Sequence, residues 1–102
     1  MLTADLAPGA WACVLHKDHG TARPIRGHVH HIHPQGAGGP DVPANRATVC
    51  ANGHDAVHAV MWAIVEGLPV PACSRKELAM ARDGVARWEA AGRPGSTRAF
   101  LG

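Results

Sequence analysis

Residues 27–34 read Gly-His-Val-His-His-Ile-His-Pro, which places four histidines in one short segment. The segment belongs to a run over residues 25–33 that contains β-branched side chains and is flanked by prolines, and these features predict a β-strand. Because side chains alternate between the two faces of a strand, His30 and His31 would point in opposite directions. One member of this adjacent pair can therefore reach a metal ion while its neighbour contacts a different group.

A loop, a second strand and a helix are expected next. Residues 35–44 contain three glycines and two prolines, which predicts a loop, and residues 47–50 are short and compatible with a strand. Asn52 would cap a helix in which apolar residues recur at spacings of three and four, until Pro69 and Pro71 end it. The apolar face of this helix is Val57, Val60, Met61, Ile64 and Leu68.

A second helix and a tail complete the predicted order. Ser74 and Glu77 match the capping-box pattern for a helix that runs to about Ala90. A glycine and a proline then stop the helix, and residues 95–102 are expected to form a tail. The apolar side of this second helix is Leu78, Ala81, Val85 and Trp88.

The expected architecture is a small α+β fold in a single domain, residues 1–102. An irregular N-terminal arm precedes a core of two short antiparallel strands, a glycine-rich loop and one helix, at about residues 25–66. The additional C-terminal helix, at about residues 75–91, lies outside this core.

Length and composition limit the class of protein. The chain has 102 residues, a formal net charge of +2 and eight histidines, all of which lie between His16 and His58. In a fold with so small a core, this excess of histidine points to a metal ion. The longest apolar stretch, residues 59–65, is too short to cross a membrane, and the N-terminus lacks the pattern of a signal peptide. We therefore expect a cytoplasmic protein without a membrane partner.

The histidine positions also indicate a type of chemistry. His54 and His58 are four residues apart on the predicted helix, so both rings project from one face and can bind a single ion. The histidines of residues 27–34 can face them from the strand. A metal ion that neutralises phosphate charge, beside a neutral imidazole that takes a proton from water, is the combination that phosphodiester hydrolysis requires.

This order of residues resembles the HNH nuclease motif, also called the ββα-metal finger. The resemblance covers roughly residues 11–62 and rests on His30-His31-Ile32-His33-Pro34, Gly38-Gly39, Asn45, Cys50, His54 and His58. It implies that His31 is the general base that activates water, that His30 and His54 are metal ligands, and that His58 is a further ligand or a phosphate contact. It also implies that Asn45 holds the loop and thereby orients the base.

Two further features of the family are less complete in this chain. Many members carry a structural zinc ion between two Cys-x-x-Cys knuckles, which here resemble Cys13-Val-Leu-His16 and Cys50-Ala-Asn-Gly53, and the fourth zinc ligand is missing because glycine stands at its position. A closed zinc site has four protein ligands, so these three could bind an additional structural zinc or could instead be buried and surface residues without a metal. Arg46 follows Asn45 in place of the usual apolar residue, and it would either contact phosphate or lie solvated in the loop.

The resemblance implies a metal-dependent endonuclease that nicks or cleaves DNA with one divalent ion, which could be zinc, nickel, manganese or magnesium. It would act as a monomer or a homodimer, and similar small HNH proteins are encoded by actinobacteria and their phages. The competing hypothesis is a module without catalytic activity that uses the metal for stability and binds nucleic acid or an adaptor partner. A structural metal site formed by the same histidines would fit that alternative.

Overall fold

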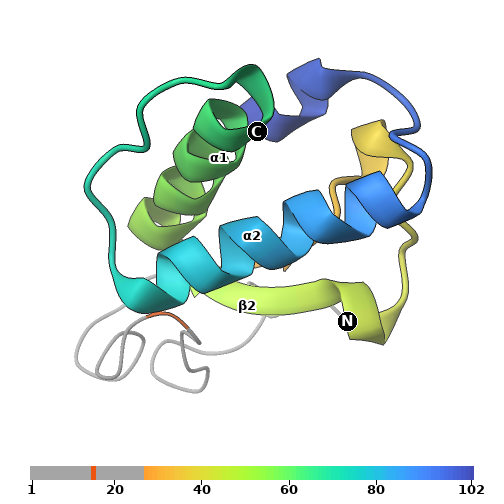
Figure 1. The fold of residues 1–102 in the computed structure, drawn as a ribbon. Helices are drawn as coiled ribbons and strands as arrows, with labels where there is room; N and C mark the ends of the chain where they lie inside the picture. The colour runs from red at the N-terminus through yellow and green to blue at the C-terminus, as the bar shows by residue number, and fades with distance from the viewer. Residues whose placement is uncertain (1–14, 16–26) are drawn as a thin grey trace.

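The computed structural model describes residue 15 and residues 27–102 (Figure 1). Strand β1 (Gly27–His31) pairs in antiparallel fashion with β2 (Arg46–Cys50), and helix α1 (Ala51–Glu66) follows β2 without a loop. The predicted α+β fold, with two antiparallel strands followed by a helix and a further helix after it, is confirmed.

The remaining elements surround this ββα core. Helix α2 (Arg75–Ala90) packs against α1, and so does the short 3-10 helix η4 (Thr97–Leu101) near the C-terminus. Two more 3-10 turns, η2 (Gln35–Ala37) and η3 (Pro43–Asn45), lie in the connection between the strands, where the loop was predicted. No helix in the described part of the chain is long and apolar enough to span a membrane.

The first strand is shorter than predicted. The last pair of the ladder is His31 with Arg46, whereas the sequence pattern placed the end of the strand at His33. The backbone N–H of Ile32 still donates to the Asn45 carbonyl in the same register (2.9 Å), whereas that of His33 donates to the side-chain Oδ1 of Asn45 (2.8 Å) and not to a carbonyl of the ladder. The predicted start of this strand lies outside the described residues.

The cap of α1 differs from the prediction as well. The helix begins at Ala51, directly after the strand, so Asn52 lies inside its first turn and is not the N-cap. Cys50, the last residue of β2, takes this position, and its Sγ accepts a hydrogen bond from the backbone N–H of Gly53 (3.2 Å). A strand that runs straight into a helix leaves only its own last side chain to cap the free N–H groups.

The C-terminal end of α1 corrects the predicted apolar face. The helix ends at Glu66, and Gly67 adopts a left-handed conformation (φ 70°), which closes the last turn. Leu68 therefore lies beyond the helix and is 51% exposed, so its assignment to the buried face was wrong. The prediction continued the helical spacing one residue past the glycine that ends it.

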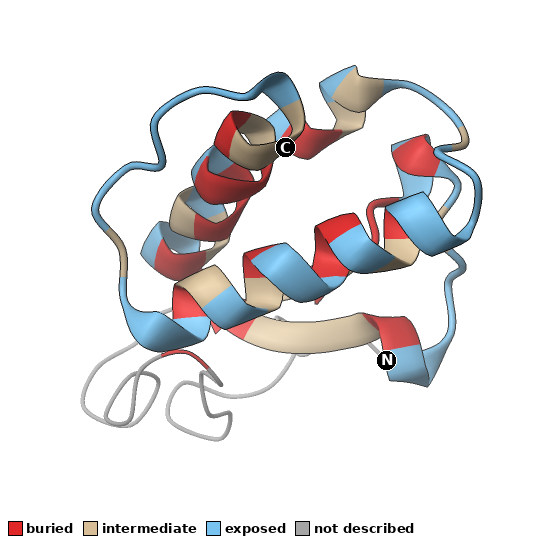
Figure 2. Ribbon diagram, in the orientation of Figure 1, coloured by how far each residue is buried: buried red, intermediate tan, exposed pale blue. Residues whose placement is uncertain are grey.

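Helix α2 forms as predicted. Ser74 Oγ accepts a hydrogen bond from the Glu77 backbone (3.1 Å), while Glu77 Oε1 accepts one from the Ser74 backbone (2.8 Å), which completes the capping box. The buried residues lie along one side of the helix (Figure 2). Of the predicted apolar side, Ala81, Val85 and Trp88 are buried and Leu78 is half-buried.

The segment predicted to be a tail is part of the core. Phe100 in η4 is completely buried, and its ring meets that of Trp88 edge to face, with centroids 5.1 Å apart. Phe100 is the only phenylalanine of the chain, and a large aromatic side chain gains much by burial. Its packing between α1 and α2 holds the C-terminal segment beside the N-terminal half of α1.

Candidate metal centre

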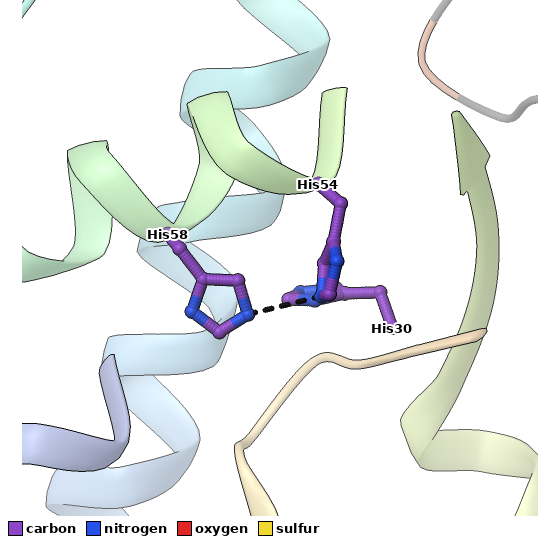
Figure 3. A group of neighbouring side chains, drawn as sticks. All are labelled: His30, His54 and His58. Carbon is purple, nitrogen blue, oxygen red and sulfur yellow. Dashed lines mark hydrogen bonds between the residues drawn. The ribbon is translucent and has the colours of Figure 1, made fainter. Parts of the chain in front are cut away.

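Three histidines converge between strand β1 and helix α1. One ring nitrogen each from His30, His54 and His58 can be chosen so that all three lie within 4.8 Å of one another. His30 reaches in from the strand, while His54 and His58 project from successive turns of the helix (Figure 3). The Nε2 atoms of His54 and His58 are 3.1 Å apart. The helical spacing and the strand alternation therefore bring the predicted set of ligands together.

The His58 ring is held by the C-terminal segment. Its Nδ1 lies 2.9 Å from the Phe100 carbonyl oxygen. Because a carbonyl only accepts hydrogen bonds, Nδ1 carries the proton and Nε2 keeps a lone pair toward the cluster. Histidines that bind metals commonly donate their second N–H in this way, which fixes the tautomer and the orientation of the ring. Sequence reasoning missed this contact, and the sole phenylalanine in a supposed tail was the available signal.

His30 shows most directly that the cluster fits a metal ion. Its side chain is fully buried, and neither ring nitrogen has a hydrogen-bond partner among the described residues. An unsatisfied polar group in the interior costs about 1–3 kcal/mol, so such atoms are rare without a ligand or water. An ion bound between His30, His54 and His58 would satisfy one of these nitrogens.

The protonation state of the cluster suits metal binding. Burial, and then the neighbouring imidazoles, lower the pKa of His30 from 6.5 to about 3. Burial and the nearby His58 ring lower the pKa of His54 to about 4. Burial also lowers the pKa of His58, although its hydrogen bond to the Phe100 carbonyl opposes the change. At neutral pH all three rings are therefore neutral, which is the form that binds metal.

His31 points away from His30 but lines the same cleft as two of the candidate ligands. The cleft has a volume of about 370 Å³, and its walls include His31, His54 and His58. The His31 side chain is 21% exposed, and its Nε2 lies 2.8 Å from Asp41 Oδ1. Asp41 also accepts a hydrogen bond from Arg46. The sequence had left two roles open for Arg46, a phosphate contact and a solvated side chain in the loop. The structure thus adds Asp41 to the residues around His31.

Asn45 fastens the loop that follows β1. Its side-chain amide donates to the carbonyls of His33 (2.8 Å) and Pro40 (2.9 Å), and its Oδ1 accepts from the His33 backbone (2.8 Å). The side chain is buried, and its hydrogen bonds go to His33, Pro40 and Arg87 and not to His31. Asn45 therefore fixes the backbone that carries the neighbouring histidines, and any effect on His31 passes through this backbone.

The other histidines and cysteines are placed as follows. His33 donates from Nε2 to the Ala37 carbonyl (2.6 Å), and the His28 ring meets the edge of His54 with centroids 5.5 Å apart. Cys50 is buried as the cap of α1. Cys13 and His16 lie outside the described residues, so the additional zinc knuckle stays a prediction.

Residues 15–59 match the family model described as HNH endonuclease. This segment is similar to the HNH endonuclease family. The match spans both strands, the loop and the first half of α1, which include His30, His54 and His58. HNH domains usually belong to nucleases that bind a divalent metal and act on DNA. Searches among curated proteins and among solved structures gave no match.

Helix α2 lies beyond the matched residues but supports the matched segment at both ends of the loop between the strands. The Arg87 Nη1 atom donates to the Ala44 carbonyl (2.9 Å) and approaches Asn45 Oδ1 (3.4 Å). Gly84 packs so closely against the carbonyl of Ile32 that a Cβ atom at this position would overlap it. The two contacts hold the backbone directly after His31 and directly before β2.

Proposed function

We propose that this protein is a metal-dependent endonuclease that hydrolyses phosphodiester bonds in DNA. His30, His54 and His58 would hold a single divalent ion, and His31 would be the general base. The observation that carries the proposal is that His31 lines the same cleft as His54 and His58, although it leaves the strand on the opposite side from His30. A base and a metal ion that face the same cleft can act on one phosphate.

The metal ligands, the base and the supporting residues have separate roles in this proposal. A divalent ion, when bound, would neutralise charge on the phosphate and stabilise the departing oxygen. His31 accepts the proton of the attacking water on a ring nitrogen. Asn45 keeps the loop backbone in place, and the Phe100 carbonyl keeps the His58 Nε2 lone pair directed toward His54, where the ion would be held.

The number of ligands favours an enzyme over a purely structural site. Among the described residues, three imidazoles converge, and they do so at the wall of an open cleft. Catalytic zinc sites have three protein ligands and one open position, whereas structural zinc sites are closed by four. Imidazole ligands also suit zinc, nickel and similar ions better than magnesium, so we expect magnesium to bind weakly.

A plasmid relaxation assay tests the proposal. The purified protein is stripped of metal and incubated with supercoiled DNA in the presence of Mg²⁺, Mn²⁺, Ni²⁺ or Zn²⁺. We expect nicked or linear DNA with at least one transition metal, and we expect His54→Ala to lose both this activity and the bound metal. Arg82→Ala, which replaces an exposed side chain on α2, is the control and should cleave like the parent.

Supercoiled DNA that persists with the parent protein under all four metals would overturn the proposal. If the same preparation bound metal and retained DNA in a mobility-shift assay, the protein would be a metal-stabilised binding module without catalytic activity.

A further inference from the structure

We propose that Asp41, held in place by Arg46, is a positioning residue that fixes the tautomer and the orientation of the His31 ring. The consequence for catalysis rests on the proposed function, but the contact itself does not. Nothing in the sequence pattern marked Asp41, which lies in the glycine-rich loop ten residues after His31.

The first step of the argument is the direction of the hydrogen bond. Asp41 Oδ1 lies 2.8 Å from His31 Nε2. The hydrogen bond from His31, assisted by the charge of Arg46, holds the pKa of the Asp41 carboxyl below its ordinary value, so the group is ionised at neutral pH. An ionised carboxylate only accepts hydrogen bonds, so Nε2 of His31 carries the proton.

The second step follows for the other ring nitrogen. With the proton on Nε2, Nδ1 of a neutral His31 holds the lone pair and is the atom that can accept a proton from water. No described residue forms a hydrogen bond with Nδ1. The ring lines the cleft beside His54 and His58, so this free nitrogen belongs to a side chain of the candidate site.

The third step is that Asp41 is itself oriented. Arg46 Nε donates to the same Oδ1 atom (3.0 Å), and Arg46 Nη2 donates to the Asp41 backbone carbonyl (3.2 Å). Arg46 lies directly opposite His31 in the β ladder, and the two side chains meet at the same Asp41 oxygen. The Asn45 side chain holds the neighbouring carbonyl of Pro40, which fixes the loop backbone beside Asp41.

The exposure of Asp41 separates positioning from stability. The side chain is 60% exposed, and exposed ion pairs contribute little to the free energy of unfolding. If the contact serves orientation, the loss of Asp41 will reduce the rate of the chemical step and leave the melting temperature and metal content close to those of the parent. A contact that serves stability alone would not change the rate without also changing the melting temperature.

The kinetic test compares Asp41→Ala and Asp41→Asn with a charge-matched control, Glu66→Ala, at an exposed position at the end of α1. We expect Asp41→Ala to lower kcat roughly 10- to 100-fold with little change in KM for DNA, the range that is found when the hydrogen-bond partner of a metal-binding histidine is removed. Asp41→Asn, which keeps an acceptor oxygen, should retain part of the activity, and Glu66→Ala should match the parent. A normal kcat for Asp41→Ala would overturn the proposal.

A second test does not require cleavage. The metal-free protein is labelled with ¹⁵N-histidine, and its ring nitrogens are observed by NMR at pH 8, where ordinary histidines are neutral. The His31 signals are assigned by their loss in His31→Gln. The parent should show His31 in the Nε2–H form alone, and Asp41→Ala should shift these signals toward the tautomer mixture of free histidine, while Glu66→Ala should not.

Identical His31 signals in the parent and Asp41→Ala would overturn the proposal even if the protein proved to be a nuclease. The expected shift in a protein that cleaves no DNA would instead support the contact and refute the proposed function. The two arms thus distinguish the failure of one idea from the failure of the other.

Discussion

The ββα core and the C-terminal region contribute to the candidate site in different ways. The core, from β1 to α1, contains every candidate ligand and the proposed base. The C-terminal region, α2 and η4, contains no histidine, yet it contacts the site through a backbone carbonyl, a glycine and an arginine. The comparison teaches that part of the support of this site comes from a region that contributes none of its chemical groups.

The strongest test of this division is the removal of the Phe100 side chain. Phe100→Ala should lower the free energy of unfolding by about 3–5 kcal/mol, as is typical for a buried aromatic ring. Because the Phe100 carbonyl holds His58, metal affinity should fall as well. Chemical denaturation and metal titration measure the two effects, and Phe100→Leu, which keeps an apolar side chain, should lose less of both. Unchanged metal affinity in a folded Phe100→Ala protein would show that η4 does not support the site.

Metal removal tests whether the histidines of the core bind the ion. A ligand that binds only the folded state, at one hundred times its dissociation constant, stabilises a protein by about 2.7 kcal/mol. The parent should therefore melt at a higher temperature with Zn²⁺ or Ni²⁺ than with a chelator, as measured by scanning calorimetry. His54→Ala should show no such increase. An equal increase in His54→Ala would mean that the metal binds elsewhere.

Gly84 tests whether α2 must approach the loop closely. An added methyl group in Gly84→Ala would overlap the Ile32 carbonyl and crowd Met61, so α2 would be displaced at a cost of about 1–3 kcal/mol. The urea midpoint measures this loss. Ala79→Ser at an exposed position of the same helix is the control and should leave the midpoint almost unchanged. A fully stable Gly84→Ala protein would argue against tight support of residue 32 by α2.

In the metal-free protein, the histidines of the core alone should make the free energy of unfolding depend on pH. The folded pKa values of His30 and His54, about 3 and about 4, lie below the ordinary value of 6.5. The folded state thus binds fewer protons, so this stability is present above pH 6.5 and is lost progressively as the pH falls below it. The urea midpoint should fall between pH 7 and pH 5, in a chelator, and His30→Leu should flatten the change. A midpoint that does not vary over this range would contradict the buried, neutral state of the cluster.

Local spacing explains which parts of the site were predictable. Strand alternation separates His30 from His31, and a spacing of four residues stacks His54 and His58, so these relations follow from the periodicity of a strand and a helix. The same rule extended the first helix to Leu68, because spacing alone does not indicate where the glycine cap ends it.

The support of the site depends on contacts that no local pattern contains. His58 and Phe100 are 42 residues apart, and the shared atom is a backbone carbonyl, which any residue could provide. The pairing of His31 with Asp41 depends on how the loop folds back over β2, and this path is set by the hydrogen bonds of Asn45. The sequence therefore predicts which histidines converge better than it predicts the groups that position them.

The rate of DNA cleavage by His31→Ala, measured together with its metal content, tests the central claim most directly. His31 lies in the shared cleft but outside the three converging ligands, so its removal should leave metal binding and folding intact. We predict the metal content and melting temperature of the parent and no detectable plasmid cleavage. A His31→Ala protein that cleaves the plasmid as fast as the parent would contradict the assignment of His31 as the base.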